Sequence, residues 1–247
     1  MMVRDGTPPR IRRFPWIFIG EIMITFGLVL ILFLAYDIWW TTSAVRVRQE
    51  QAIKELRQSW GKSDAPEPSK SMESTPQATP RPKQSENHTS SGQEYARGLL
   101  LSDPIGIIRI PRLGKKWQAT IHEGVHKRDV LDRGFVGHYS PTALPGMQGN
   151  VALAAHSITH GALFAHLNRL RHGDRIYIET QYRKLEYVVD GGPYITSPQD
   201  VSVITPVPRH SGFDRPGKYI TLTTCWPPMT SSKRMIYWGH QVSVRTE

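Results

Sequence analysis

The stretch Thr221-Leu222-Thr223-Thr224-Cys225, followed nine residues later by Arg234, decides how this chain is interpreted. Residues 218–225 are mostly β-branched, aromatic or apolar, a composition that predicts a strand. The strand should end at Trp226-Pro227-Pro228, because a proline offers no N–H to a ladder and restrains the residue before it. A second strand pattern starts at Met235, and a hairpin-like unit would return Arg234 to the thiol of Cys225.

The segment around this stretch, residues 99–247, has a normal size for one domain with its own core. Glycine, proline and aspartate divide it into about seven or eight strand patterns, the spacing expected of an antiparallel barrel or sandwich. The fold class is therefore mainly β. The expected strands are residues 105–110, 117–121, 150–155, 175–180, 185–190, 218–225 and 235–244, and the expected turns of helix are 127–133, 163–170 and 198–203.

Residues 14–40 are apolar apart from three positions, and a helix needs about 20 such residues to cross a bilayer. Tryptophan and tyrosine stand at both ends, as at membrane interfaces. A cleaved signal peptide is the competing interpretation, but the apolar run exceeds the usual length and the cleavage site is weak. We therefore expect a retained single-pass transmembrane anchor.

Arginines precede this anchor at positions 4, 10, 12 and 13, which predicts a cytoplasmic N-terminus, residues 1–13, and an extracytoplasmic domain. Residues 41–98 are expected to be an extracytoplasmic linker, mostly disordered. Its first part, 41–57, could continue as a polar helix, whereas 59–92 is rich in Pro, Ser, Thr, Gln, Lys and Glu and cannot bury enough apolar surface to fold.

The net charge of +10 could indicate a nucleic-acid partner. No helix-turn-helix, zinc-finger or RNA-binding pattern accompanies the charge, so we exclude nucleic acid and expect a solvated basic surface. A single cysteine also excludes an intramolecular disulfide.

Three side chains with catalytic potential stand at expected strand ends: His156, Cys225 and Arg234. A nearby imidazole or guanidinium stabilises a thiolate, and an arginine can bind the oxyanion of an acyl transfer. The imidazole could protonate the leaving amine and deprotonate the incoming one. From residue types alone the alternative stays open that Cys225 is an inert core thiol.

A metal site is a further alternative. His156 and His160 have the spacing of two zinc ligands on a helix. Gly161 follows at once after a strand, however, so the pair is better interpreted as part of a turn, and we expect no metal or cofactor.

The motif T-L-T-T-C with its later arginine resembles the signature of the sortases, and the chain order His156, Cys225, Arg234 agrees with theirs. G-N-V-A-L-A-A-H-S-I-T-H-G (149–161) resembles the strand and loop that carry the catalytic histidine of that family. G-H-Y-S-P-T-A-L-P-G (137–146) and the apolar segment from G-E-I-M-I-T-F-G-L-V-L (20–30) are similar to the class E sortases of high-GC Gram-positive bacteria.

The resemblance implies an eight-stranded β-barrel and a membrane-anchored cysteine transpeptidase. Such enzymes cleave a C-terminal sorting motif, Leu-Ala-x-Thr-Gly or Leu-Pro-x-Thr-Gly, between Thr and Gly through a thioacyl intermediate. They then join the secreted surface protein to an amine of a lipid II-like peptidoglycan precursor in the cell wall.

By residue match, the resemblance makes Cys225 the nucleophile, His156 the general acid and base, and Arg234 the oxyanion and substrate ligand. Thr224, Tyr139 and Trp226 would contact substrate, with Tyr139 favouring the Leu-Ala motif; Tyr139 could equally be a half-buried loop aromatic. Two positions depart from the family: Ser157, where many relatives have arginine, and Trp226, where class E members often have histidine.

Two alternative functions remain at this point. A pilin-polymerising sortase would differ only in its acceptor, a lysine of a second pilin. A catalytically silent, membrane-tethered barrel would bind wall polymers through its basic face, with Cys225 packed in the core. The domain shows no carboxylate cluster at loop spacing, which argues against bound calcium.

Overall fold

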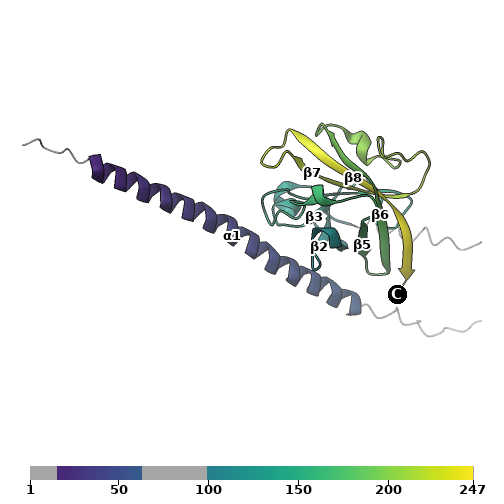
Figure 1. Cartoon of the computed structure of the whole chain (residues 1–247). Coiled ribbons are helices and arrows are strands. Elements are labelled where there is room, and N and C mark those ends of the chain that lie inside the picture. Colours follow the sequence, from purple (N-terminus) through teal and green to yellow (C-terminus); the bar gives the residue numbers. More distant parts are fainter. Residues whose placement is uncertain (1–15, 63–98, 247) are drawn as a thin grey trace, which may run out of the picture. The chain divides into compact units, whose positions relative to one another are not determined.

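Residues 16–62 and 99–246 are described by the computed structural model of the chain (Figure 1). The chain divides into two units, Met1–Thr41 and Thr42–Glu247. The predicted cytoplasmic terminus, 1–13, and the proline-rich part of the predicted linker lie outside the described residues.

The helix α1 (Trp16–Lys62) runs through residues 41–57, where a polar helix was expected to continue. Within the part of the chain that the structure describes, no helix is long and apolar enough to cross a membrane. The transmembrane anchor predicted over residues 14–40 is therefore not shown by the structure.

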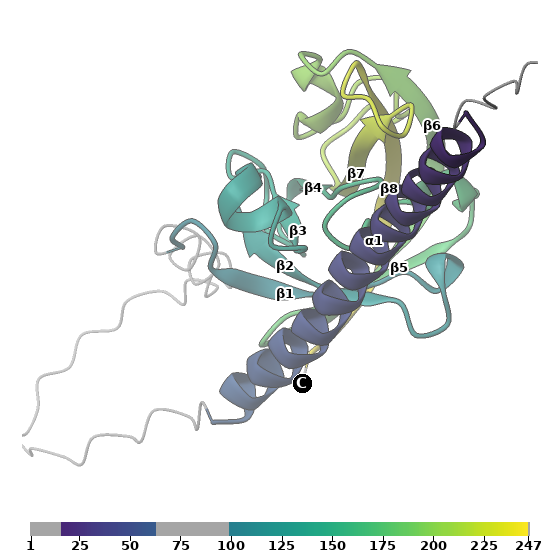
Figure 2. The ribbon, with the colours of Figure 1, turned by 90° about the vertical axis from the view of Figure 1, so that its left-hand side faces the viewer.

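Eight strands form one closed barrel in the order β1-β2-β3-β4-β7-β8-β6-β5 (Figures 1 and 2). The mainly β fold class and the eight-stranded barrel are thus confirmed. The strands are β1 (Pro104–Arg109), β2 (Gln118–Glu123), β3 (Val136–His138), β4 (Gly149–Ala154), β5 (Arg175–Glu179), β6 (Arg183–Thr196), β7 (Lys218–Trp226) and β8 (Lys233–Thr246).

The expectation of a purely antiparallel sheet is wrong, because β2 pairs with β3 and β4 pairs with β7 in parallel. A parallel pair needs a crossover rather than a tight hairpin. Between β2 and β3 the crossover contains a short π-helical turn, η2 (Lys127–Leu131). Between β4 and β7 it contains β5, β6 and two 3₁₀ turns, η3 (Leu167–Arg169) and η4 (Val201–Ile204).

Two elements of the barrel were not expected from the sequence: β3 and the 3₁₀ turn η1 (Pro111–Leu113). The strand β6 also extends well beyond the predicted 185–190. It continues past Gly191 and Gly192 through irregularities in its register with β8. Pairing with a neighbour over its whole length keeps the strand going where local composition predicts a break.

The barrel is filled by apolar side chains of alternating strand positions. On β7 these are Ile220 and Leu222, and their β8 neighbours Met235 and Tyr237 belong to the same core. The intervening residues of β7 therefore face the opposite side of the sheet, and this alternation decides which side chains share a face with the thiol.

Candidate active site

Three adjacent strands, β4, β7 and β8, bring the predicted catalytic residues together. Cys225 and Arg234 are direct cross-strand partners of β7 and β8. On the other side of β7, Ala154 pairs with Thr223 at the end of β4. Continuing that parallel register by two residues sets His156 beside Cys225.

Two hydrogen bonds carry the register past the last paired residues. The backbone N–H of Ala155 donates to the carbonyl oxygen of Thr223 at 3.3 Å. The hydroxyl of Thr224 donates to the carbonyl oxygen of Ala155 at 2.8 Å. Ala155, which precedes His156, is therefore hydrogen-bonded to the two residues that precede Cys225.

Strand alternation separates the two threonines that precede Cys225. Thr224 is buried on the core side, opposite Met235. Thr223 shares the face of Cys225, and its hydroxyl lies 3.2 Å from that of Tyr139. Tyr139 is thus placed on the thiol face, whereas Thr224 links β7 to the histidine-bearing segment.

Cys225 is a free, half-buried thiol, as a nucleophile that must reach a substrate requires. Trp226 follows it, half-buried, and packs against the barrel core. The neighbouring Arg234 donates from Nη1 to the carbonyl oxygens of Ser231 at 3.1 Å and Lys233 at 3.0 Å. These bonds hold the guanidinium at the β7–β8 turn. Among the hydrogen bonds of the described residues, they leave Nε and Nη2 for a ligand.

Asp132 is a site residue that the sequence did not reveal. Its Oδ1 lies 2.8 Å from Nε2 of His156 and 3.7 Å from Nδ1 of His160. A carboxylate bonded to one ring nitrogen selects the tautomer and orients the imidazole, so that the other nitrogen is presented to its target. Asp132 follows η2, 24 residues before His156, and no spacing rule connects the two positions.

The pKa of His156 lies below its ordinary value of 6.5. Burial of the ring is the largest cause, and together with the charges of His160 and Lys127 it outweighs the hydrogen bond and the charge of Asp132, which raise the pKa. The imidazole of the free protein is therefore mostly neutral at pH 7, and Asp132 moderates the depression.

Asp132, His156 and His160 also present ligand atoms within 4.8 Å of one another, a set that a divalent cation could use. In a tetrahedral zinc site with bonds of 2.0–2.1 Å, ligand atoms stand roughly 3.3 Å apart. The 2.8 Å contact between Asp132 and His156 is shorter than this and satisfies both groups. The geometry is that of a hydrogen-bonded pair, and the pair would have to separate to hold a metal.

The loop that carries Tyr139 is fixed by a buried pair of side chains. His138 on β3 is the register partner of Glu123 on β2. Nδ1 of His138 lies 2.8 Å from Oε2 of Glu123, within hydrogen-bond distance. Its other nitrogen contacts the carbonyl oxygen of Ala143 and the hydroxyl of Thr142, each at 3.1 Å. Burial raises the pKa of Glu123, but the bonds from His138 and Ser140 together lower it below its ordinary value.

Comparison with known proteins decides the family. The sortase domain family matches residues 108–242, which include all three candidate catalytic residues. The chain is a member of the sortase family.

Class E sortases are among the proteins that this chain is similar to. It is 38% identical over 232 residues to sortase SrtE1 of Streptomyces coelicolor, covering 92% of this chain and 57% of that relative's length. The solved structure of sortase E from Streptomyces avermitilis is 43% identical with a TM-score of 0.55, covering 60% of this chain and 93% of the other. The structure of sortase E1 from Streptomyces coelicolor, which holds a tripeptide in its active site, is 45% identical with a TM-score of 0.56, covering 58% and 91%.

Proposed function

We propose that this sortase is a cysteine transpeptidase that cleaves a C-terminal sorting motif and transfers the cleaved protein to an amine. The observation that carries the proposal is the convergence of three residues at neighbouring strands: Cys225 on β7, Arg234 opposite it on β8, and His156 two residues past the end of β4. A nucleophile, a proton carrier and an oxyanion ligand at one edge of a sheet are the groups that acyl transfer requires.

In this mechanism neutral His156 takes the thiol proton of Cys225, and the resulting Sγ thiolate attacks the carbonyl carbon of the motif threonine. Free N–H groups of Arg234 donate to the oxygen as it becomes negative. Protonated His156 gives its proton to the departing glycine amine, and the peptide bond breaks to leave a thioester. An acceptor amine then attacks the thioester while neutral His156 takes the amine proton, which restores the thiolate and the imidazolium.

The substrates belong to the same proposal. We assign a Leu-Ala-x-Thr-Gly or Leu-Pro-x-Thr-Gly motif on secreted proteins and a lipid II-like amine in the peptidoglycan of a Gram-positive cell wall. The similarity to class E sortases supports this, as does the tripeptide in the active site of the Streptomyces coelicolor enzyme. Tyr139 lies on the thiol face, where it can contact such a peptide.

The location at the cell membrane, with the barrel outside, is also proposed. Its support is the run of large apolar side chains of α1 that are exposed between Phe18 and Phe33. Exposed apolar surface of this kind is unfavourable in water and is covered by lipid or by another chain. Retention of the full chain in carbonate-washed membranes is the expected result.

The decisive experiment is turnover of fluorogenic peptides that carry either motif, with and without an amine acceptor. Wild-type protein should cleave between Thr and Gly and form the transpeptidation product. Cys225→Ala should abolish cleavage and transfer, because no other described side chain at this edge can form the thioester. Retained activity in Cys225→Ala would overturn the proposal, and absence of turnover together with an unreactive Cys225 thiol would favour the silent wall-binding barrel.

A further inference from the structure

Two loops of the candidate site, one next to Asp132 and one next to His160, contact each other through their backbones. One loop follows Asp132 and contains Gly134; the other follows His160 and contains Gly161. A Cβ at Gly134 would lie 3.1 Å from the carbonyl oxygen of His160, so the two backbones are in close contact. Any element that supports this junction also sets the distance between Asp132 and the histidine-bearing loop.

The distal part of α1 reaches this junction through Val45, which is buried. A Cβ added at Gly134 would lie 2.4 Å from Cγ1 of Val45, and one added at Gly161 would lie 2.3 Å from the same atom. Both glycines have positive φ angles, +83° and +84°. Glycine is therefore required at both positions for two reasons: it adopts the left-handed backbone without strain, and it leaves the space that the Val45 side chain occupies.

Hydrogen bonds from the next turn of α1 hold the Asp132 loop. Buried Gln49 donates from Nε2 to the carbonyl oxygen of Gly134 at 2.5 Å. Its Oε1 accepts from the backbone N–H of Thr120 at 2.8 Å and from the hydroxyl at 3.2 Å. Arg48 donates to the carbonyl oxygen of Arg133 at 2.9 Å. The two carbonyl groups that follow Asp132 are therefore both bound by the helix, and Gln49 ties one of them to β2.

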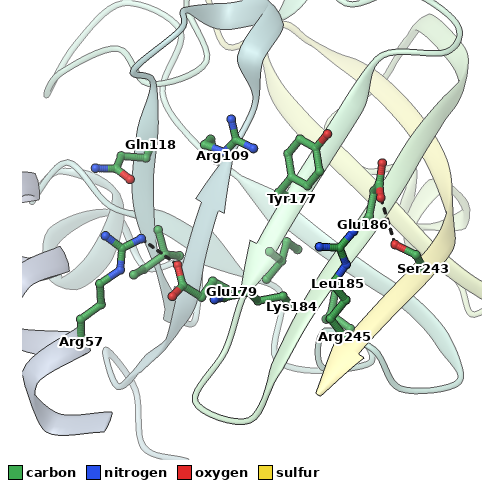
Figure 3. A pocket seen from close by; sticks show the side chains of 12 residues that line it. Arg57, Arg109, Gln118, Tyr177, Glu179, Lys184, Leu185, Glu186, Ser243 and Arg245 are labelled. Carbon is green, nitrogen blue, oxygen red and sulfur yellow. Dashed lines mark hydrogen bonds and ion pairs between the residues drawn. The ribbon is translucent and has the colours of Figure 1, made fainter. Parts of the chain in front are cut away.

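The same helix has a second contact farther along the barrel. Ile53 and Leu56 are buried with Ile107 of β1. Arg57 donates to the carboxylate of Glu179 on β5 at 2.7 Å, beside a cavity of about 420 Å³ (Figure 3). The residues that line this cavity include none of the catalytic three. This end therefore attaches the helix, while the Val45–Gln49 end reaches the site.

We propose that the barrel-facing side of α1 between Val45 and Arg57 is a positioning element of the catalytic site, with Gln49 as the residue that holds Asp132 against His156. Burying a glutamine amide is unfavourable unless its bonds are made, and each bond of Gln49 ends on the backbone or side chain of the barrel. The inference rests on the proposed transpeptidase function for its catalytic consequence, but its structural part concerns only the Asp132–His156 pair.

The test compares Gln49→Ala with Gln51→Ala in the full chain in lipid nanodiscs. Gln51 lies on the same helix with an exposed side chain, so it controls for loss of a glutamine from α1. Two properties are measured: the titration of the His156 ring by NMR, and kcat and KM for a sorting-motif peptide across pH. The NMR titration needs no turnover, so failure of the proposed function and failure of this inference are distinguished.

In Gln49→Ala, the Asp132 loop should loosen and the His156 titration should move to lower pH, because Asp132 raises that pKa. The value of kcat should fall about tenfold or more, with little change in KM, since the reacting groups lose their alignment. Gln51→Ala should match wild type in both measurements. Addition of Gln49→Ala to Asp132→Asn should cause little further shift, because the partner through which Gln49 acts is already altered.

Two outcomes would overturn the proposal. One is a Gln49→Ala protein with a lower Tm but an unchanged His156 titration, which would reduce Gln49 to a structural residue. The other is a Gln49→Ala shift that adds in full to that of Asp132→Asn, which would show that Gln49 acts by another route.

Discussion

Arg234 turns one guanidinium nitrogen toward two carbonyl oxygens of its own turn, a geometry that an ammonium group reproduces poorly. Lysine at this position would keep the charge and lose the planar arrangement of donors. Arg234→Lys should therefore lower kcat/KM by about 10²- to 10³-fold, the usual effect of removing an oxyanion donor. Steady-state kinetics with a sorting-motif peptide tests this, and a value near wild type would mean that charge alone suffices.

Asp132 shifts the titration of the His156 imidazole in a direction that can be measured. Both its hydrogen bond and its charge raise the pKa of His156, against the larger effect of burial. In Asp132→Asn the charge is lost, so the pKa of His156 should fall further below 6.5. The limb of the pH profile of kcat/KM that reports His156 should move to lower pH. An upward shift would contradict the assigned contact.

At the scale of elements, the three-residue strand β3 is held by the cross-strand pair of Glu123 and His138. Glu123→Gln keeps the shape but removes the charge, and it should lower the free energy of unfolding by about 1 to 2 kcal/mol. The folded pKa of Glu123 lies below its ordinary 4.5, so the wild-type pair is at full strength above that value and is lost as pH falls through the folded pKa. Denaturant unfolding at pH 7 and pH 4 should show the difference between the proteins shrinking at the lower pH.

The strands that sequence predicted best are those whose local composition and tertiary partners agree. Residues 218–225 are mostly β-branched, aromatic or apolar and lie in β7, which extends one residue further, to Trp226. The strand β3 escaped prediction because Val136-Gly137-His138 has one strand-forming residue, and its neighbours β2 and β4 supply the pairing. Parallel pairing was missed for a related reason: side-chain alternation reveals the faces of a strand but not the direction of its neighbour.

In the candidate site, too, local sequence predicted some contacts, whereas others depend on the tertiary fold. Cys225 and Arg234 are close in sequence, and turn chemistry was enough to predict their approach. Asp132 meets His156 only because the loop after η2 folds against the loop after β4. The contribution of α1 was equally hidden, since Gln49 looks like any polar residue of a solvated helix until the barrel buries it.

For the whole molecule, buried His122 and half-buried His156 should make the free energy of unfolding decrease as pH is lowered. The pKa values of His122 and His156 both lie below 6.5, with burial as the largest cause in each. The unfolded chain then binds more protons than the folded one as pH drops below 6.5, so the free energy of unfolding decreases with pH in that range. The Tm should therefore decline between pH 7.5 and pH 5.

A single replacement can separate the two contributions. His122 stacks on Phe135 with ring centroids 3.8 Å apart, so a phenyl ring can occupy its place. His122→Phe should flatten the decline of Tm with pH, and its Tm at pH 7.5 should drop because the bonds to Ser102 and Thr120 are lost. An unchanged slope would assign the whole effect to other groups.

The parallel pairing of β4 and β7 also determines when the protein can become active. His156 follows the end of β4 and Cys225 lies on the neighbouring strand β7, yet β5 and β6 lie between them in the chain. Contacts between residues so distant in sequence form late, after the loop between them has been closed. A chain still emerging from synthesis or export would carry its thiol without a proton partner. In refolding experiments, the time at which peptide cleavage appears should therefore report barrel closure, because activity requires that the last strands have paired.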